Sequence, residues 1–157
     1  MKTTKKMHTT LEFPADGKRG AVQLHWYQEK GGPQAFRDLK APKGGFNNLF
    51  IGTEGKLLCG FDKHLLLPED KFVDYKVPQT FEKSPGFHKE WINAIKGGKP
   101  STCNFSYSGP MSEAVLLANI AYRVQGTFEW DQANLKPLGN PAAEALIKEV
   151  YKKGWEI

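Results

Sequence analysis

The hydrophobic pattern of this sequence changes once, near Ser84-Pro85, and this change constrains the fold more than any other feature. Before it, apolar and polar residues alternate over residues 8–13 and 21–27, and short apolar runs follow at 49–52 and 56–60. Alternation and short apolar runs are typical of β-strands, whereas apolar residues spaced three and four apart are typical of α-helices. The helical spacing dominates after residue 84, so strands are expected first and helices later.

Turn-forming residues separate the expected strands. Residues 14–17, Pro-Ala-Asp-Gly, divide the first two runs, and residues 53–55, Thr-Glu-Gly, divide the next two. These turns predict two antiparallel hairpins. A short strand is expected at 64–67, followed by an extended segment at 72–77. Residues 29–45 are rich in Gly and Pro and have no periodic apolar face, so we expect a long loop there.

Three helices are expected after the change of pattern, with one short strand, 128–130, between the second and the third. Ser84 can cap the free amides of the first helix, and Gly97-Gly98 gives the backbone freedom to end it. The second helix is expected to follow Ser108-Gly109-Pro110, and the third to open at Asn140-Pro141. The order of elements separates most strands from most helices.

This separation predicts an α+β fold for residues 1–157 as a single domain, with a mainly antiparallel open sheet and helices packed on one face. The composition, 39% hydrophobic and 25% charged, is that of an ordinary globular domain. The strands carry apolar residues on both alternations, among them Leu24, Trp26, Phe50 and Leu58. We therefore expect a partner surface to cover the second sheet face, and predict a homo-oligomer formed through it.

The positive charge of the chain does not indicate nucleic-acid binding. The net charge is +5, but the basic residues are dispersed lysines with only three arginines, whereas bidentate recognition of bases and phosphates favours arginine. No apolar run approaches the ~20 residues that span a bilayer, and the first eight residues lack the apolar core of a signal peptide. We expect no nucleic-acid or membrane partner, and a soluble protein that is cytoplasmic by default.

Motifs for cofactor binding and catalysis are absent from the sequence. There is no GxGxxG or GxxxxGK[ST] after an expected strand, no GxSxG, and no pair of carboxylates at a suggestive spacing. Cys59 and Cys103 form no CxxC, and the four histidines form no HExxH. The two cysteines are expected to be free, buried thiols, although a disulfide between them stays open. We assign no catalytic, cofactor-binding or metal-binding residue.

Three residues are candidates for substrate binding: His25, Trp26 and His88. His25 and Trp26, with Tyr27, could form an aromatic platform for a sugar ring, and packing in the core is the alternative use of these side chains. His88 lies in the first turn of an expected helix, where neighbouring backbone donors favour a neutral ring. The alternative for His88 is a partly exposed helix residue without a ligand.

Several phrases of the sequence, in this order, resemble oxidoreductases of the Gfo/Idh/MocA family (the glucose-fructose oxidoreductase and inositol dehydrogenase type). The resemblance covers nearly the whole chain, and each phrase is weak alone whereas their order is specific. The phrases are LHWY at 24–27, GKLLCG at 55–60, SPGFHKEWI at 84–92, NFSYSGP at 104–110, EAVLL at 113–117, EWD at 129–131 and KGW at 153–155.

The resemblance implies a division of labour within such an enzyme. In that family an N-terminal Rossmann domain binds NAD or NADP, and a C-terminal domain with an open sheet shapes the substrate pocket and commonly makes the oligomer contact. This chain is similar only to the latter. The family's glycine-rich fingerprint, its Glu-Lys-Pro segment with the catalytic lysine and its Asp-x-x-x-His motif are expected to precede Met1. Where the family often has Gly-His-His, this chain has Gly86-Phe87-His88.

The resemblance therefore implies a substrate-pocket and oligomerisation domain of an NAD(P)-dependent sugar or cyclitol dehydrogenase. Such a domain is expected to bind no cofactor and to be inactive alone, because hydride transfer needs a cofactor held against the substrate. Whether the chain acts as part of an enzyme is left open at this point. The alternative is a free-standing module that binds a carbohydrate or a protein through its open sheet face.

Overall fold

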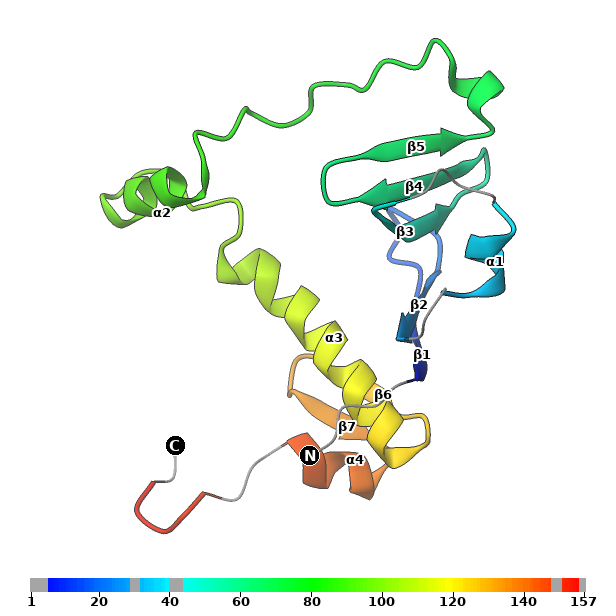
Figure 1. Ribbon diagram of the computed structural model, residues 1–157. Coiled ribbons are helices and arrows are strands. Elements are labelled where there is room, and N and C mark those ends of the chain that lie inside the picture. The colour runs from blue at the N-terminus through cyan, green and yellow to red at the C-terminus, as the bar shows by residue number, and fades with distance from the viewer. Residues whose placement is uncertain (1–5, 29–31, 40–43, 148–150, 156–157) are drawn as a thin grey trace. The chain divides into compact units, whose positions relative to one another are not determined.

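The computed structural model describes residues 6–28, 32–39, 44–147 and 151–155 (Figure 1). The chain divides into two compact units, of which the first comprises Met1–Lys30 with Gly86–Ile157 and the second Gly31–Pro85. Strands pair antiparallel in three small sheets and helices accompany them, so the predicted α+β class is confirmed. That all 157 residues act as one domain stays a prediction.

The first unit opens with the predicted hairpin of β1 (Met7–Phe13) and β2 (Val22–Gln28). Met7 lies opposite Gln28, and Phe13 lies opposite Val22, without a register shift. The connecting turn is held by Asp16, whose carboxylate accepts the backbone N–H groups of the two residues Lys18 and Arg19 at 3.0 Å each. The short polar side chain thus fixes the turn locally.

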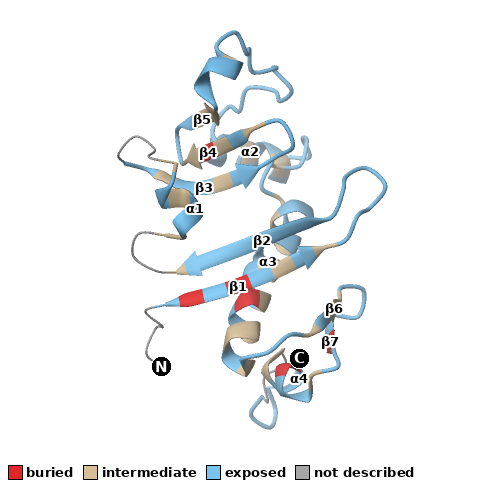
Figure 2. Cartoon of the chain, turned by 90° about the vertical axis from the view of Figure 1, so that its right-hand side faces the viewer, coloured by how far each residue is buried: buried red, intermediate tan, exposed pale blue. Residues whose placement is uncertain are grey.

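Helix α3 (Phe105–Val124) packs against β1 and forms the core of this unit. Figure 2 shows buried residues where the two elements meet; they include Met7 and Thr9 on the strand and Ala118 on the helix. The small side chain of Ala118 allows the helix backbone to approach the strand closely. The core of the first unit is therefore built around β1.

The start of α3 corrects the sequence-based expectation. The helix was expected to follow Ser108-Gly109-Pro110, but it begins at Phe105, and Pro110 lies inside it. The cause is Asn104, whose side chain accepts the backbone N–H of Ser106 at 3.0 Å and so caps the helix one turn earlier. A proline so close to the start removes one intrahelical hydrogen bond but does not end the helix.

A second hairpin and a helix complete the first unit. β6 (Glu129–Asp131) pairs with β7 (Lys136–Leu138), and α4 (Pro141–Ile147) packs against β7 and α3. The strand β7 was not expected, because a proline in its centre disguises a strand in the sequence. In the turn, the side-chain and backbone N–H groups of Asn134 donate to the Asp131 carboxylate at 2.7 and 3.1 Å and lower its pKa.

Helix α2 (Phe87–Ile95) also belongs to the first unit. The predicted cap at Ser84 is wrong, because the N-cap is Gly86, which has a φ of 105° and offers no side chain. The predicted end at Gly97-Gly98 is confirmed, since Gly97 has a φ of +85° after the last turn. The apolar side of α2 is exposed.

The second unit is a three-stranded antiparallel sheet in the order β3-β4-β5. Its strands are β3 (Phe46–Ile51), β4 (Lys56–Gly60) and β5 (His64–Leu67), and Leu58 at its centre is fully buried. The predicted hairpin at 49–60 and the predicted strand at 64–67 are confirmed.

Two short helices in the second unit differ from expectation. The predicted loop at 29–45 contains a helix, α1 (Gln34–Arg37), while residues 29–31 and 40–43 lie outside the described residues. The segment expected to be extended from Phe72 begins instead with the last residue of a 3-10 helix, η1 (Glu69–Phe72). Pro68 is the N-cap of η1 and has an extended backbone, with φ −69° and ψ 146°.

Candidate functional site

The two faces of the β1–β2 hairpin differ in chemistry. Residues directly opposite each other in an antiparallel pair share a face. One face carries the apolar pairs Leu11 with Leu24 and Phe13 with Val22, and it includes Thr9 opposite Trp26. The other face carries the polar and aromatic pairs, which are His8 with Tyr27, Thr10 with His25 and Glu12 with Gln23.

Each pair on the polar face is in direct contact. The rings of His8 and Tyr27 are stacked, with centroids 4.2 Å apart and planes at 12°. Thr10 Oγ1 and His25 Nδ1 are hydrogen-bonded at 3.0 Å. At the turn end, the Gln23 side-chain amide donates to a Glu12 carboxylate oxygen at 3.0 Å. Three contacts, one in each successive residue pair, hold the side chains of this face in defined positions.

The ring of His25 lies next to the stacked pair, in the neighbouring cross-strand pair of the same face. Its ring centroid is 5.8 Å from that of His8 and 6.3 Å from that of Tyr27, with both rings tilted. Such distances lie in the range of favourable aromatic contacts. The three rings therefore form one cluster, and the hydrogen bond to Thr10 fixes the ring furthest from the open end of the hairpin.

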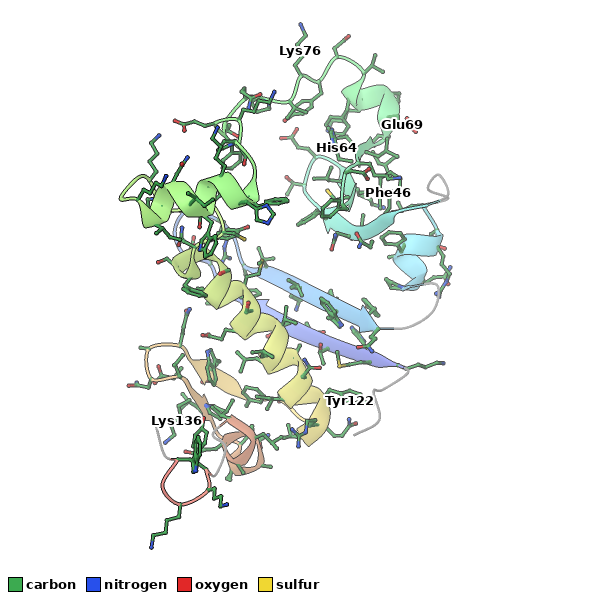
Figure 3. All side chains as sticks on the ribbon, turned by 60° about the vertical axis from the view of Figure 1, so that its left-hand side comes forward. Phe46, His64, Glu69, Lys76, Tyr122 and Lys136 are labelled. Atoms are coloured by element: carbon green, nitrogen blue, oxygen red, sulfur yellow. The ribbon has the colours of Figure 1, made fainter. Side chains whose placement is uncertain are left out.

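A hollow lies at the open end of the hairpin, beside the stacked rings. Its volume is about 330 Å³, and it is lined by Lys6, Met7, His8, Tyr27 and Tyr122. Figure 3 labels Tyr122 on α3, near the beginning of β1. The hollow exists because α3 packs on β1 and so brings a tyrosine beside a strand more than a hundred residues earlier in the chain.

The structure separates the three candidate substrate-binding residues predicted from the sequence. His25 lies on the polar face with Tyr27, but Trp26 lies on the apolar face, as alternation along a strand requires. His88 is exposed in the first turn of α2, and no contact among the described residues joins it to His25 or Trp26. The platform of His25, Trp26 and Tyr27 therefore does not form as one surface, and substrate roles for these residues stay predictions.

Sequence reasoning missed Lys6, His8 and Tyr122 as site residues. His8 carried a usable signal, because the alternation of residues 8–13 and the length of the turn together place it opposite Tyr27. Tyr122 carried none, since its place depends on how α3 packs. Lys6 precedes the alternating segment and gives no periodic signal of its own.

Helix α3 covers only half of the apolar face of the hairpin. The β1 half is buried or half-buried, whereas Val22, Leu24 and Trp26 on β2 remain 40% to 46% exposed. Exposed apolar side chains that follow one another on a strand face can mark a contact with another surface. This strip on β2, formed by Val22, Leu24 and Trp26, is the second candidate surface.

The described residues show neither a metal-binding cluster nor a membrane-spanning helix. They contain no group of three or more His, Cys, Asp or Glu side chains placed to hold a metal ion. None of the helices in the described ranges is both long enough and apolar enough to cross a membrane. Cys59 and Cys103 are free thiols, as predicted, but the prediction that both are buried is wrong, because Cys59 is half-buried and Cys103 is exposed.

Comparisons with models of protein families, with curated proteins and with solved structures found no match. The resemblance to the Gfo/Idh/MocA family therefore depends on the ordered sequence phrases alone.

Proposed function

We propose that this chain is the substrate-pocket and oligomerisation domain of an NAD(P)-dependent sugar or cyclitol dehydrogenase of the Gfo/Idh/MocA type. The ordered phrases that resemble this family extend from LHWY at 24–27 to KGW at 153–155. In such an enzyme the dinucleotide is held by a Rossmann domain, whose motifs these 157 residues do not contain. The domain proposed here would supply the wall of the substrate site and the contact between subunits.

The observation that supports this proposal most is the half-covered apolar face of the hairpin. The strip on β2 exposes Val22, Leu24 and Trp26, although the paired strand β1 is buried by α3. Each Å² of apolar surface removed from water contributes roughly 25 cal/mol, so a strip of three large side chains favours association with another surface. A second exposed apolar surface lies on α2, where Phe87 and Trp91 are 84% and 62% exposed.

The isolated chain is not expected to catalyse hydride transfer. Hydride transfer requires a nicotinamide held against the substrate carbon, and the organic chemistry belongs to the cofactor. The polar face of the hairpin offers hydrogen-bonding groups and aromatic rings, which can position a substrate but cannot accept a hydride. The isolated chain should therefore bind ligand and associate with copies of itself without catalysing a reaction.

The association is tested by light scattering on purified chain with two matched variants. Leu24→Lys places a charge in the exposed strip, and Gln23→Lys places the same charge one residue earlier on the opposite face, beside Glu12. We expect the wild type and Gln23→Lys to form a dimer or larger assembly and Leu24→Lys to be a monomer. A wild-type monomer at all concentrations, or a monomer in both variants, contradicts an oligomer contact through the strip.

The division of labour is tested by titrating the chain with NADH and following the nicotinamide fluorescence. We expect no saturable binding up to millimolar NADH, with a conventional dehydrogenase as the positive control. A dissociation constant in the low micromolar range would overturn the proposal, because it would require a dinucleotide site within these residues.

One observation favours a second candidate, a free-standing module that binds a carbohydrate or protein through the exposed strip. Trp26 is 40% exposed on a strand face, as a ring that stacks on a sugar would be. Under this alternative, Trp26→Ala abolishes binding of a carbohydrate and leaves the folded circular dichroism spectrum unchanged. If Trp26→Ala instead unfolds the hairpin, Trp26 serves packing and the alternative is rejected.

A further inference from the structure

The three-stranded sheet of the second unit carries a cysteine directly opposite a histidine. Cys59 on β4 pairs with His64 on β5, so both side chains lie on the same face of the sheet. Cys59 is half-buried and His64 is exposed, and Figure 3 labels His64 at the start of β5. A thiolate sulfur and an imidazole nitrogen are ligands that zinc prefers in proteins. The pair therefore offers two ligands for a metal ion.

The turn beside the pair brings these two side chains close together. The backbone N–H of Gly60 donates to the carbonyl oxygen of Lys63 at 2.8 Å and closes the turn. Hydrogen-bonded and non-hydrogen-bonded pairs alternate along an antiparallel ladder, so the next pair, Cys59 with His64, is a non-hydrogen-bonded one. In such pairs the Cα atoms are only about 4.5 Å apart and the side chains are closest. Sulfur and imidazole can therefore reach one ion.

Both side chains are available for a ligand. Cys59 is a free thiol, and His64 makes no hydrogen bond, ion pair or ring contact with the described residues. The ammonium group of the adjacent Lys63 is already engaged, since it donates to the Gly44 carbonyl oxygen at 3.2 Å and lies 5.8 Å from the centre of the Phe46 ring. A metal ion at the pair would thus replace no contact among the described residues.

One chain supplies fewer ligands than a structural zinc ion requires. Such ions are bound by four ligands in a tetrahedron, and the described residues place no third His, Cys, Asp or Glu beside Cys59 and His64. A two-fold dimer brings the same surface of each copy together. Two copies would supply two cysteines and two histidines, which is a ligand set of structural zinc sites. The two thiolates also balance the charge of Zn²⁺.

The same face of the sheet carries an apolar row that a second copy would cover. Phe50, Leu57 and Leu66 lie opposite one another in the row next to the pair. Phe50 is 60% exposed, and the row lines an open hollow of about 320 Å³. Leu58 lies on the other face and is fully buried. Contact through the face of the pair would therefore remove apolar surface from water, which stabilises an assembly.

We propose that Cys59 and His64 form one half of a zinc site, which a second copy of the chain completes through this sheet face. On binding, Zn²⁺ exchanges water for two thiolate sulfurs and two imidazole nitrogens. The two thiol protons pass to the solvent, and no electron is transferred. The inference goes beyond the proposed function, because it requires neither a dehydrogenase nor the strip on β2.

Titration of the full wild-type chain with Co²⁺ tests the ligand set, with the thiols kept reduced by a phosphine. Co²⁺ occupies zinc sites and absorbs light according to its ligands and geometry. We expect a thiolate-to-cobalt charge-transfer band together with the visible bands of a tetrahedral site. The bands should saturate at one ion for two chains and disappear when Zn²⁺ displaces the cobalt.

Light scattering tests the role of the second copy. The chain used is Leu24→Lys, because this substitution blocks the association expected through the strip on β2. We expect its mass to double when Zn²⁺ is added and to return to that of a monomer when EDTA removes the metal.

Two variants with matched controls locate the site. Cys59→Ser and His64→Gln should each weaken Co²⁺ binding at least about 10-fold and abolish the zinc-dependent dimer, because each removes two of the four ligands. The controls are Cys103→Ser and His88→Gln, which change the other cysteine and another exposed histidine. Neither control should change the affinity or the zinc-dependent mass.

Three results would overturn the inference. These are the absence of a tetrahedral cobalt spectrum, saturation at one ion per chain without a change of mass, and equal loss of binding in Cys59→Ser and Cys103→Ser. The metal-free wild type separates this inference from the proposed function. If it assembles and Leu24→Lys does not respond to zinc, the zinc site alone is rejected. If it is a monomer that zinc converts to a dimer, the zinc site is supported and the contact through the strip is rejected.

Discussion

Strands β1 and β2 are neighbours of equal length with the same alternation of side chains, and they differ in what covers their shared apolar face. On β1, Met7 and Thr9 are buried at 6% and 8% exposure, whereas Val22, Leu24 and Trp26 on β2 are 40% to 46% exposed. The sequence pattern of the two strands does not contain this difference. It arises because α3 packs along β1 and does not extend over β2.

Two properties of a strand have different causes: which side chains share a face, and which of these side chains are buried. Alternation decides which side chains share a face, because successive side chains of a strand point to opposite sides. Burial is decided by the element that packs on that face. An exposed apolar half beside a buried half therefore indicates a position for a further surface.

Removing a side chain from the buried strand should have the largest effect. Met7→Ala should lower the free energy of unfolding by about 2–5 kcal/mol, as truncation of buried methionines does. Val22→Ala on the exposed strand should change it by no more than about 0.5 kcal/mol in dilute monomer. Urea denaturation followed by tryptophan fluorescence measures both. Equal costs in the two strands would remove the basis of the comparison.

The same pair of variants sharpens the comparison at high protein concentration. If a second copy covers the strip on β2, the cost of Val22→Ala should rise with concentration, because the truncated side chain is then buried in the assembly. The cost of Met7→Ala should stay constant, since α3 covers it within one chain. A constant cost for both would argue against an assembly through β2.

A substitution at Thr9 is expected to raise the free energy of unfolding, not to lower it. Its hydroxyl is buried without a hydrogen-bond partner among the described residues. Thr9→Val, of similar shape, should raise the free energy of unfolding by about 1 kcal/mol, because a buried unpaired hydroxyl costs about 1–3 kcal/mol. The control is Thr10→Val on the polar face, which loses its bond to His25 and should lower stability by about 0.5–1.5 kcal/mol. The same urea series decides the sign.

A smaller effect is expected on the polar face, which has no cover from α3. A double-mutant cycle of His8→Ala and Tyr27→Ala should give a coupling free energy of about 0.5 kcal/mol, the size of a cross-strand aromatic pair. The control cycle of His8→Ala with Gln23→Ala, whose side chains belong to different pairs, should give no coupling. Coupling in both cycles would show that the mutations perturb the hairpin as a whole.

The smallest effect concerns the turn that joins the two strands. Hydrogen bonds from the backbone N–H groups of Lys18 and Arg19 hold the pKa of the Asp16 carboxyl below its usual value. An unfolded aspartate titrates near about 3.9, so the stabilisation is present above that pH and is lost as the pH falls through the lower folded value. NMR titration of the Asp16 carboxyl carbon should show this lowered pKa, with the urea-unfolded chain as reference.

The variant Asp16→Asn separates charge from hydrogen bonding in this turn. The amide oxygen of asparagine can still accept the two backbone N–H groups, so the hairpin should form. Its stability should no longer vary through this residue as the pH falls below about 3.9, whereas the wild type should lose stability as the pH falls through the lowered pKa of the folded state. The same loss in Asp16→Asn would assign the pH dependence to other carboxyl groups.

Much of the fold could be predicted because its signals are local. The turn at residues 14–17 and the alternation on either side fix the first hairpin, and the glycines after residue 96 end α2 where expected. The start of α3 was misplaced because Gly109-Pro110 is a strong break signal, and a single hydrogen bond at Asn104 overrides it. The strand β7 was not predicted because its central proline argues against a strand in the sequence, although proline is tolerated in an edge strand.

The candidate site was less predictable because it depends on distant elements. His25 and Trp26 were grouped because they are adjacent in sequence, but adjacency in a strand places them on opposite faces. The stacked pair of His8 and Tyr27 requires the hairpin register, which the turn length supplies. Tyr122 requires the packing of α3, for which the sequence gives no measure of position.

Which side chains share a face of the hairpin follows from the sequence, since a period of two residues sorts side chains without reference to the rest of the chain. The turn at residues 14–17 was likewise predicted, whereas the cap at Asn104, although it is a local contact, was found only in the structure. The packing of α3 buries Met7 and Thr9 on the apolar face of β1, leaves that face of β2 exposed and places Tyr122 beside the hollow. The physical reason is that burial depends on Ala118, which lies 111 positions after Met7, and the packing of such distant segments is not encoded in a local pattern.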